Sequence, residues 1–101
     1  MNKISVVIPA YNVEKYIDKS FESLLNQTFK EFEVIAINDG SQDYTLEKMK
    51  AYEARDSRIR VINKANEGVG ATRNLGLTLA SSDYIIFIDP DDCLHPDMLK
   101  S

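Results

Sequence analysis

The sequence predicts an α/β domain in which a mostly parallel sheet of about four strands carries helices on both faces. Four short apolar runs alternate with three segments whose apolar residues recur at helical spacing. This βαβαβαβ order is typical of a doubly wound sheet, because each helix returns the chain to the side from which the next parallel strand starts. The 101 residues, 44% hydrophobic and 28% charged, suit a single domain over residues 1–101.

The first half of the chain contains two predicted strands and one predicted helix. Residues 4–8 form a nearly continuous β-branched apolar run, as expected of a strand buried on both faces, and Pro9 is expected to end it. A helix is predicted over residues 14–26, with the inward side chains Tyr16, Ile17, Phe21, Leu24 and Leu25. The second strand, 32–37, is expected to stop at the turn cluster 38–41.

The second half continues the alternation. A helix is predicted over residues 44–56, with one side formed by Leu46, Met49 and Tyr52. A third strand over 59–62 is followed by a helix over 69–80, with the inward side chains Val69, Thr72, Leu75 and Leu79. The fourth strand covers 84–88, and a last turn is expected near Pro96, since proline is a favoured first helical residue.

Polar segments follow three of the four predicted strands. They are Tyr11-Asn12 after the first strand, Asn38-Asp39-Gly40-Ser41 after the second and Asp89-Pro90-Asp91-Asp92 after the fourth. Doubly wound sheets bind ligands at the carboxyl ends of their strands, where the strand order reverses. One such loop is expected by chance, but three at one edge favour a binding site there.

The acidic loop places Asp89, Asp91 and Asp92 within four residues. Crowded carboxylates are unfavourable unless a cation compensates them. Oxygen ligands suit Mg²⁺ or Mn²⁺, which are usually held by one or two carboxylates together with substrate phosphates, as in a bound diphosphate. A solvated acidic turn, in which Asp91 or Asp92 caps a helix, explains the same residues equally well.

Three polar residues near the first two strands also have two interpretations each. The Asp39 carboxylate could accept the imide N–H of uracil, or it could bond its own backbone in an Asx-turn. Tyr11 could stack on a base, or it could be a partly buried aromatic below the first helix. Asn12 is interpreted as structural, either as an early helix cap or as a residue that orders the loop.

Arg73 stands near the start of the third predicted helix, shortly after Gly68 and Gly70. The glycines allow a close approach of the backbone, and an arginine there can reach a phosphate or pair with a carboxylate. The alternative is an exposed arginine whose stem lies on apolar surface. The glycines do not form a dinucleotide-binding fingerprint, because they follow the third strand and their spacing differs.

Composition and charge exclude several classes of protein. The net charge of −4 comes without a basic stripe, which argues against nucleic acid as a partner. No apolar run is long enough to span a membrane, and the N-terminus lacks the pattern of a signal peptide. The single Cys93 fits a reducing compartment, so a cytoplasmic location is expected. Cys93 and His95 lack the partners of a zinc site.

Taken together, four motifs resemble the N-terminal, nucleotide-sugar-binding part of a family 2 glycosyltransferase. They are SVVIPAYN (5–12), NDGSQD (38–43), NEGVGATRNLG (66–76) and DPDD (89–92). The resemblance covers the chain from end to end in order. It implies the GT-A fold, a Rossmann-like three-layer sandwich with strand order 3-2-1-4.

The resemblance also implies residue roles. Asp39 would bind uracil, Arg73 would lie near the phosphates or the acidic loop, and Asp89 and Asp91 would form the family's Asp-x-Asp motif. The nucleotide-sugar-binding residues would be Pro9, Ala10, Tyr11, Asn12, Asp39, Arg73, Asp89, Pro90 and Asp91. The ligands of a Mn²⁺ or Mg²⁺ cofactor would come from Asp91, Asp89 and Asp92.

The implied reaction transfers a sugar from a nucleotide sugar, with UDP favoured by Asp39, to a saccharide or lipid-linked acceptor. It would proceed with inversion and metal assistance, for cell-surface polysaccharide, in the cytoplasm or at the inner face of the membrane. No catalytic residue is assigned, because the family's catalytic base would lie beyond Ser101. The chain is therefore expected to be a fragment that is inactive alone.

Three further expectations follow from the comparison with the family. Asn38 replaces the first of two acids that usually precede the Gly-Ser pair, so it keeps an acceptor and loses the charge. Strand 84–88 would form a sheet edge through which the chain could form homo-oligomers.

A nucleotidyltransferase-like domain is the alternative function, although residues 10–14 lack the glycine and arginine of such a domain. A response-regulator-like module would need an acidic pair after the first strand, and the sequence has no such pair there.

Overall fold

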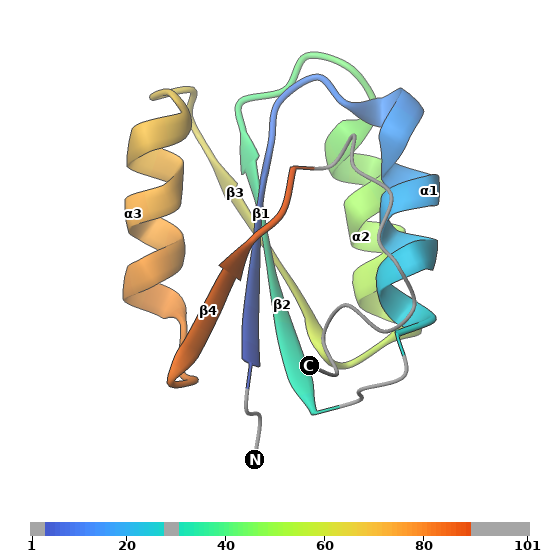
Figure 1. Cartoon of the computed structure of the whole chain (residues 1–101). Coiled ribbons are helices and arrows are strands. Elements are labelled where there is room, and N and C mark those ends of the chain that lie inside the picture. The colour runs from blue at the N-terminus through green and yellow to red at the C-terminus, as the bar shows by residue number, and fades with distance from the viewer. Residues whose placement is uncertain (1–3, 28–30, 90–101) are drawn as a thin grey trace.

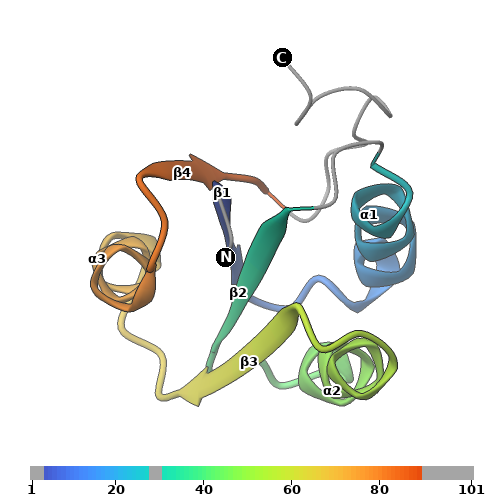
Figure 2. The same ribbon diagram turned by 90° about the horizontal axis from the view of Figure 1, so that it is seen from below.

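The computed structural model describes residues 4–27 and 31–89, which form a three-layer α/β domain. Within these residues the elements are β1 (Ile4–Ala10), α1 (Glu14–Leu25), β2 (Phe32–Asp39), α2 (Thr45–Arg55), β3 (Ile59–Lys64), α3 (Val69–Leu79) and β4 (Tyr84–Phe87). The strands are parallel in the order β3-β2-β1-β4. Helices α1 and α2 cover one face and α3 covers the other (Figure 2). The predicted fold class and strand order are confirmed.

The central strands β1 and β2 are buried on both faces. Val6 and Ile8 of β1 point into the larger core below α1 and α2, which also contains Phe21 and Met49. Val7, between them, points to the opposite face and packs with side chains of β2 and α3. The near-continuous apolar runs thus follow from burial by helices on both sides.

Strand β1 does not end at Pro9, as the sequence suggested, but continues to Ala10. The Val7 carbonyl accepts a hydrogen bond from Ile88 N, so Val7 presents its backbone groups to β4. Because alternate residues of a strand point their backbone groups to the same side, Pro9 also faces that side, beyond the last residue paired with β4. The missing N–H therefore breaks no bond of the sheet.

The ends of β2 and β3 also extend past the predicted limits. Asn38 and Asp39, expected to begin a turn, remain in β2 and pair with Asn63 and Lys64 of β3. This pairing fixes the direction of the Asp39 side chain by strand register. The same register places Lys64 beside it.

The helices lie close to their predicted positions, but one side chain faces a different direction from the predicted one. Tyr16 was expected to face inward, but it is exposed, while Ile17, Phe21 and Leu24 form the buried side of α1. The buried positions recur every three or four residues, and Tyr16 falls outside that stripe. The Val69 side chain and the turn expected near Pro96 lie outside the described part of the chain.

Glycine lets α3 pack closely on the sheet. A methyl group at Gly76 would overlap Val7 Cγ1 and lie 3.1 Å from Val7 Cγ2. Helix α3 therefore contacts the centre of β1 through a residue without a side chain. None of the helices within residues 4–27 and 31–89 has the length and apolar character needed to cross a membrane.

A polar cluster fixes the start of β4 at the edge opposite the carboxyl ends. Glu33 Oε2 accepts hydrogen bonds from the Ser5 hydroxyl, from Ser81 N at 2.8 Å and from Ser81 Oγ at 2.7 Å. Burial opposes ionisation, but the hydrogen bonds from Ser5 and Ser81 hold the pKa of Glu33 below its ordinary value. The charged carboxylate thus links β1, β2 and the turn before β4.

Candidate functional site

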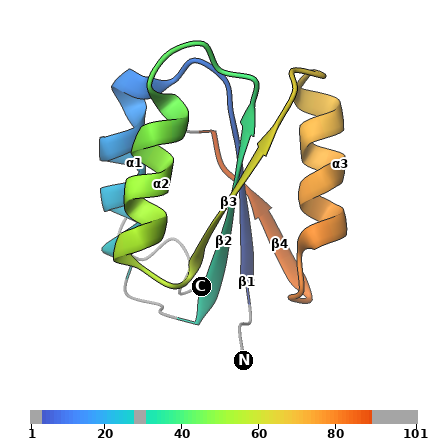
Figure 3. The same ribbon diagram turned by 180° about the vertical axis from the view of Figure 1, so that it is seen from behind.

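The loops that follow β1, β2 and β3 meet at the carboxyl edge of the sheet (Figures 1 and 3). A cavity of about 320 Å³ opens there, and its lining comes from the ends of β1 and β2, the loops after β1 and β3, and the start of α3: Pro9, Ala10, Tyr11, Asp39, Asn66, Gly68 and Thr72. Its volume lies at the lower end of the range for small-molecule sites. Four of the predicted site residues, Pro9, Ala10, Tyr11 and Asp39, are therefore brought together.

Asp39 is the buried acidic group of this cavity. Its Oδ1 accepts hydrogen bonds from Lys64 Nζ at 3.0 Å and Glu67 N at 2.9 Å, and its Oδ2 accepts one from Gly68 N at 3.0 Å. Burial opposes ionisation, but the hydrogen bonds from Glu67 N, Lys64 and Gly68 N hold the pKa of Asp39 below its ordinary value. The cavity wall consequently carries a fixed carboxylate at neutral pH. The local Asx-turn suggested as an alternative is replaced by bonds to the next loop.

Two glycines with positive φ allow the loops to approach each other. Gly40 has φ 69°, and a Cβ there would lie 2.7 Å from Asn66 N. Gly68 has φ 97° and donates its N–H to Asp39. Both backbones adopt a conformation that side chains disfavour. The β2–α2 and β3–α3 loops are thus in contact, and Asp39 sits at their junction.

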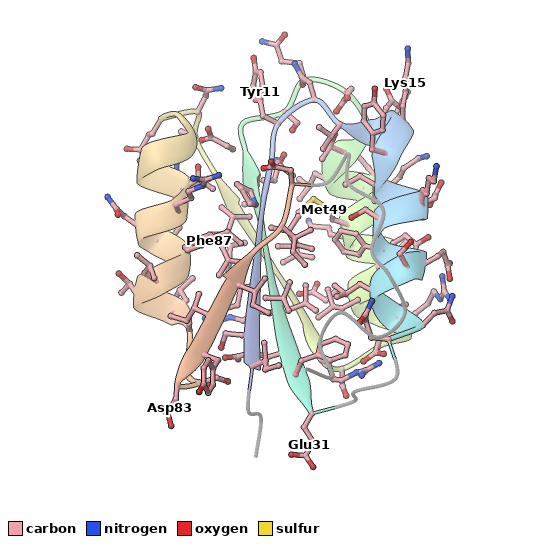
Figure 4. The ribbon with its side chains drawn as sticks, viewed as in Figure 1. Tyr11, Lys15, Glu31, Met49, Asp83 and Phe87 are labelled. Atoms are coloured by element: carbon pink, nitrogen blue, oxygen red, sulfur yellow. The ribbon has the colours of Figure 1, made fainter. Side chains whose placement is uncertain are left out.

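Asn12 joins the first two loops, in agreement with its structural interpretation. Its backbone N donates to Ser41 Oγ at 2.9 Å, and its Oδ1 accepts from Gln42 N at 2.8 Å. The residue has φ 51°, a conformation that asparagine tolerates better than most residues. Tyr11, its neighbour, is 48% exposed and lies at the loop edge of the sheet (Figure 4), with its ring available to a ligand.

The start of α1 is capped by Asp43 of the β2–α2 loop and by Thr45 at the start of α2, a feature that the sequence analysis missed. Val13 N donates to Thr45 Oγ1 at 2.9 Å and Glu14 N donates to Asp43 Oδ2 at 3.3 Å. Asp43 also accepts from the Thr45 N–H at the start of α2. One carboxylate thus satisfies free N–H groups of two helices. An aspartate shortly before a helix signals the local cap, but only the fold reveals the second one.

Asn38 is directed into the protein and away from the cavity. Its Nδ2 donates to Asn63 Oδ1 at 2.9 Å, and its Oδ1 accepts from Ser41 N at 3.3 Å. The amide is nearly fully buried and spans β2, β3 and the adjacent turn. A second charge at this position is absent, and the neutral amide suits these two internal contacts.

Arg73 is not among the residues that line the cavity. Its guanidinium carbon lies 5.5 Å from the centroid of the Phe87 ring, on the side of the sheet that α3 covers (Figure 4). Thr72, one residue earlier, is buried and lines the cavity instead. Successive helical residues point about 100° apart, so the two side chains cannot share a direction.

The acidic loop begins in the described structure but does not end in it. Asp89 is exposed just after Ile88, whose N–H still bonds to β1. Pro90, Asp91 and Asp92 lie outside the described residues. Within residues 4–27 and 31–89, no cluster of three or more His, Cys, Asp or Glu side chains could hold a metal ion. The metal ligands assigned from the sequence remain a prediction.

Comparison with known proteins identifies the architecture. The family model described as glycosyl transferase family 2 matches residues 5–101, which confirms the resemblance predicted from the four motifs. Glycosyltransferase GlyA of Streptococcus pneumoniae is 40% identical over 100 residues, which are 99% of this chain and 14% of that protein. The chain thus spans a small share of this relative.

Solved structures agree on the fold. S. aureus TarS 1–349 in complex with UDP-GlcNAc superposes with a TM-score of 0.90 at 37% identity, covering 97% of this chain and 29% of that one. The mannosyltransferase PcManGT from Pyrobaculum calidifontis, in complex with GDP-Man and Mn²⁺, gives a TM-score of 0.89 at 18% identity, over 96% of this chain and 30% of that one. At that identity the second likeness concerns the fold alone.

Proposed function

This chain belongs to glycosyl transferase family 2, and we propose that it forms the donor-binding part of a transferase that uses a UDP-sugar. The observation that carries the proposal is the cavity at the carboxyl edge with the buried, ionised Asp39 in its wall. A relative at 37% identity, TarS, has been solved with UDP-GlcNAc. Ligands of doubly wound sheets bind at this edge.

The uracil base would occupy the cavity between Tyr11 and Asp39. Uracil presents one ring N–H between two carbonyl groups, and Asp39 Oδ2 has accepted only the hydrogen bond from Gly68 N among the described contacts. A carboxylate oxygen can accept two hydrogen bonds, so Oδ2 can receive the imide N–H. The exposed Tyr11 ring can stack on the base.

The diphosphate would extend from the cavity toward the end of β4. The strand order reverses between β1 and β4, so their carboxyl ends flank the crevice that such folds use for ligands. Asp89 follows β4 there, and its carboxylate chemistry suits a hard divalent cation. We assign the cation to Asp89, Asp91 and Asp92, where Mn²⁺ or Mg²⁺ would neutralise the diphosphate. We assign Arg73, whose guanidinium lies against the Phe87 ring of β4, to the phosphates.

The rest of the reaction lies with the whole protein. The sugar would pass with inversion to a saccharide or lipid-linked acceptor during synthesis of cell-surface polysaccharide, in the cytoplasm or at the inner face of the membrane. The base that deprotonates the acceptor is assigned to residues other than the 101 of this chain. The chain alone is therefore expected to bind donor without transferring sugar.

Isothermal titration calorimetry with UDP tests the proposal, with and without Mn²⁺. We expect Mn²⁺-dependent binding that is weakened in Asp91→Ala. Asp83→Ala removes an exposed carboxylate just before β4, at the opposite edge of the sheet (Figure 4), and serves as the matched control that binds normally. Folded protein that binds no UDP at millimolar concentrations would contradict the proposal.

N3-methyl-UDP provides a test of Asp39 that leaves the protein unchanged. Methylation removes the single ring N–H and leaves the diphosphate and ribose intact. Loss of a hydrogen bond to a charged group should weaken binding by roughly 10- to 100-fold relative to UDP. Equal affinities for the two ligands would refute the assignment of the base to Asp39.

A further inference from the structure

Lys64 lies beside the cavity, yet all its hydrogen-bonding capacity is directed into the protein. Its ammonium group donates to Asp39 Oδ1 at 3.0 Å, to Ala65 O at 2.9 Å and to Glu67 Oε1 at 2.8 Å. An ammonium group has three protons, so each proton has an acceptor. The side chain is only 13% exposed. Lys64 thus has no donor left for a ligand phosphate.

The position of Lys64 follows from the sheet. Asp39 and Lys64 are register partners at the ends of β2 and β3, and neighbouring side chains of paired strands point to the same face. Strand pairing alone therefore brings the lysine beside the carboxylate, and the conformation of the β3–α3 loop is not needed for this contact. It then holds the loop itself, through Ala65 O and the Glu67 side chain.

Asp39 can accept only a limited number of further hydrogen bonds from a ligand. Two carboxylate oxygens offer about four acceptor sites. Lys64 Nζ and Glu67 N use both sites of Oδ1, and Gly68 N uses one of Oδ2. Among the described contacts, a single acceptor site therefore remains, and it is on Oδ2.

We propose that Lys64 is a positioning residue of the base site, and that by occupying Asp39 Oδ1 it restricts the cavity to bases whose pairing edge presents a single N–H donor, as in uracil. The proposal rests on the proposed function, since it presumes that Asp39 meets the base. Guanine presents two adjacent N–H donors, which need both oxygens of a carboxylate. Cytosine and adenine present a ring nitrogen acceptor, which a carboxylate repels.

Charge supports the same role. A carboxylate that is only 6% exposed is unfavourable without a compensating partner, and Lys64 is the cation in contact with it. The hydrogen bond to Glu67 raises the pKa of Lys64, burial lowers it, and the hydrogen bond to Asp39 raises it further. The pKa therefore stays above its ordinary value, and the ammonium group stays charged. Glu67 is 62% exposed, which leaves Asp39 as the buried half of the group.

The test compares UDP with N3-methyl-UDP by calorimetry in wild type, Lys64→Met and Lys64→Arg. Wild type should prefer UDP by roughly 10- to 100-fold. Lys64→Met should bind UDP more weakly and lose most of that preference, because Asp39 and the loop are no longer held in place. Lys64→Arg keeps the charge and donors, so it should recover part of the preference. GDP and CDP should bind wild type much more weakly than UDP.

Lys48→Met is the matched control. Lys48 forms an ammonium–carboxylate pair of similar length with Asp18, at 2.9 Å, on the outer surface of α1 and α2. Its removal should leave both affinities unchanged. Thermal unfolding of each variant shows whether it is folded; if Lys64→Met fails to fold, Lys64→Gln, which keeps a donor without the charge, replaces it.

The outcomes separate the two proposals. If wild type prefers UDP and Lys64→Met keeps the full preference, the role of Lys64 is refuted and that of Asp39 stands. If wild type binds both ligands equally, the assignment of Asp39 fails, and the inference about Lys64 fails with it. A tight GDP complex of wild type would refute the restriction to a single N–H.

Discussion

Substituting Gly76 by alanine should destabilise the protein, because helix α3 lies so close to β1 that a methyl group has no room. The added carbon would overlap Val7 Cγ1 and lie 3.1 Å from Cγ2 and 3.3 Å from Cβ, whereas carbon atoms pack at about 3.5–4.0 Å. Val7 is fully buried, β-branched and held in a central strand, so it cannot turn aside. Helix α3 must therefore move outward.

The expected size follows from two opposing effects. Overpacking of a core costs about 1–3 kcal/mol, and alanine favours the helix over glycine by about 1 kcal/mol. The free energy of unfolding should therefore fall by up to about 2 kcal/mol, and each kcal/mol lowers the melting temperature by about 4–8 °C for a domain of this size. Urea unfolding followed by circular dichroism measures the first quantity, and a thermal scan measures the second.

Gly70 provides the control within the same helix. Among the described residues, no atom would lie within 4 Å of a Cβ at Gly70, and its φ is not positive. Gly70→Ala should therefore leave stability unchanged or raise it by about 0.5 kcal/mol through helix propensity. If both alanines change stability in the same direction, close packing of α3 on Val7 is not the cause.

Three further predictions concern charged groups. The folded pKa of Glu33 is lowered, so its stabilisation is complete above the unfolded pKa of about 4.3 and is lost as pH falls through the folded pKa; Glu33→Gln should flatten this acid loss in urea titrations. Asp43→Ala removes caps at the starts of α1 and α2 and should lower the free energy of unfolding by about 1–2 kcal/mol; an unchanged urea midpoint would contradict it. Antiparallel pairing of two β4 edges centred on Ile86 would oppose Asp83 to Asp89, so any self-association should increase with salt in light scattering.

The sequence predicted the order of the elements better than their ends. The layer arrangement follows from alternating apolar patterns, because only a parallel sheet with helices on both faces buries them. The strand order, in contrast, was implied by the resemblance of the four motifs to the family. Pro9 and Asp39 were misplaced because turn propensity is a local property, whereas pairing with a neighbouring strand keeps both residues in the sheet. Tyr16 was misplaced because an aromatic residue next to an apolar stripe looks like part of it.

The sequence predicted which loops form the candidate site, but it predicted only some of the side-chain contacts in it. Asp39 and Tyr11 were proposed from their places at the carboxyl ends of two predicted strands, and both line the cavity. Lys64 carried no local signal, since its role depends on strand register, which brings it beside a residue far away in the sequence. Arg73 was assigned to the phosphates from its place near a helix start and from the family resemblance; it does not line the cavity, and its guanidinium lies against the Phe87 ring.

Asp39 is a binding group in the proposal and a structural group in the fold, and this double role decides how it can be studied. Its carboxylate holds the β3–α3 loop through Glu67 N and Gly68 N, so a substitution changes these backbone contacts as well as the contact with the ligand. A weaker affinity in Asp39→Asn would therefore not distinguish a lost base contact from a displaced loop. Changing the ligand at N3 or the lysine at position 64 alters one side of the contact at a time.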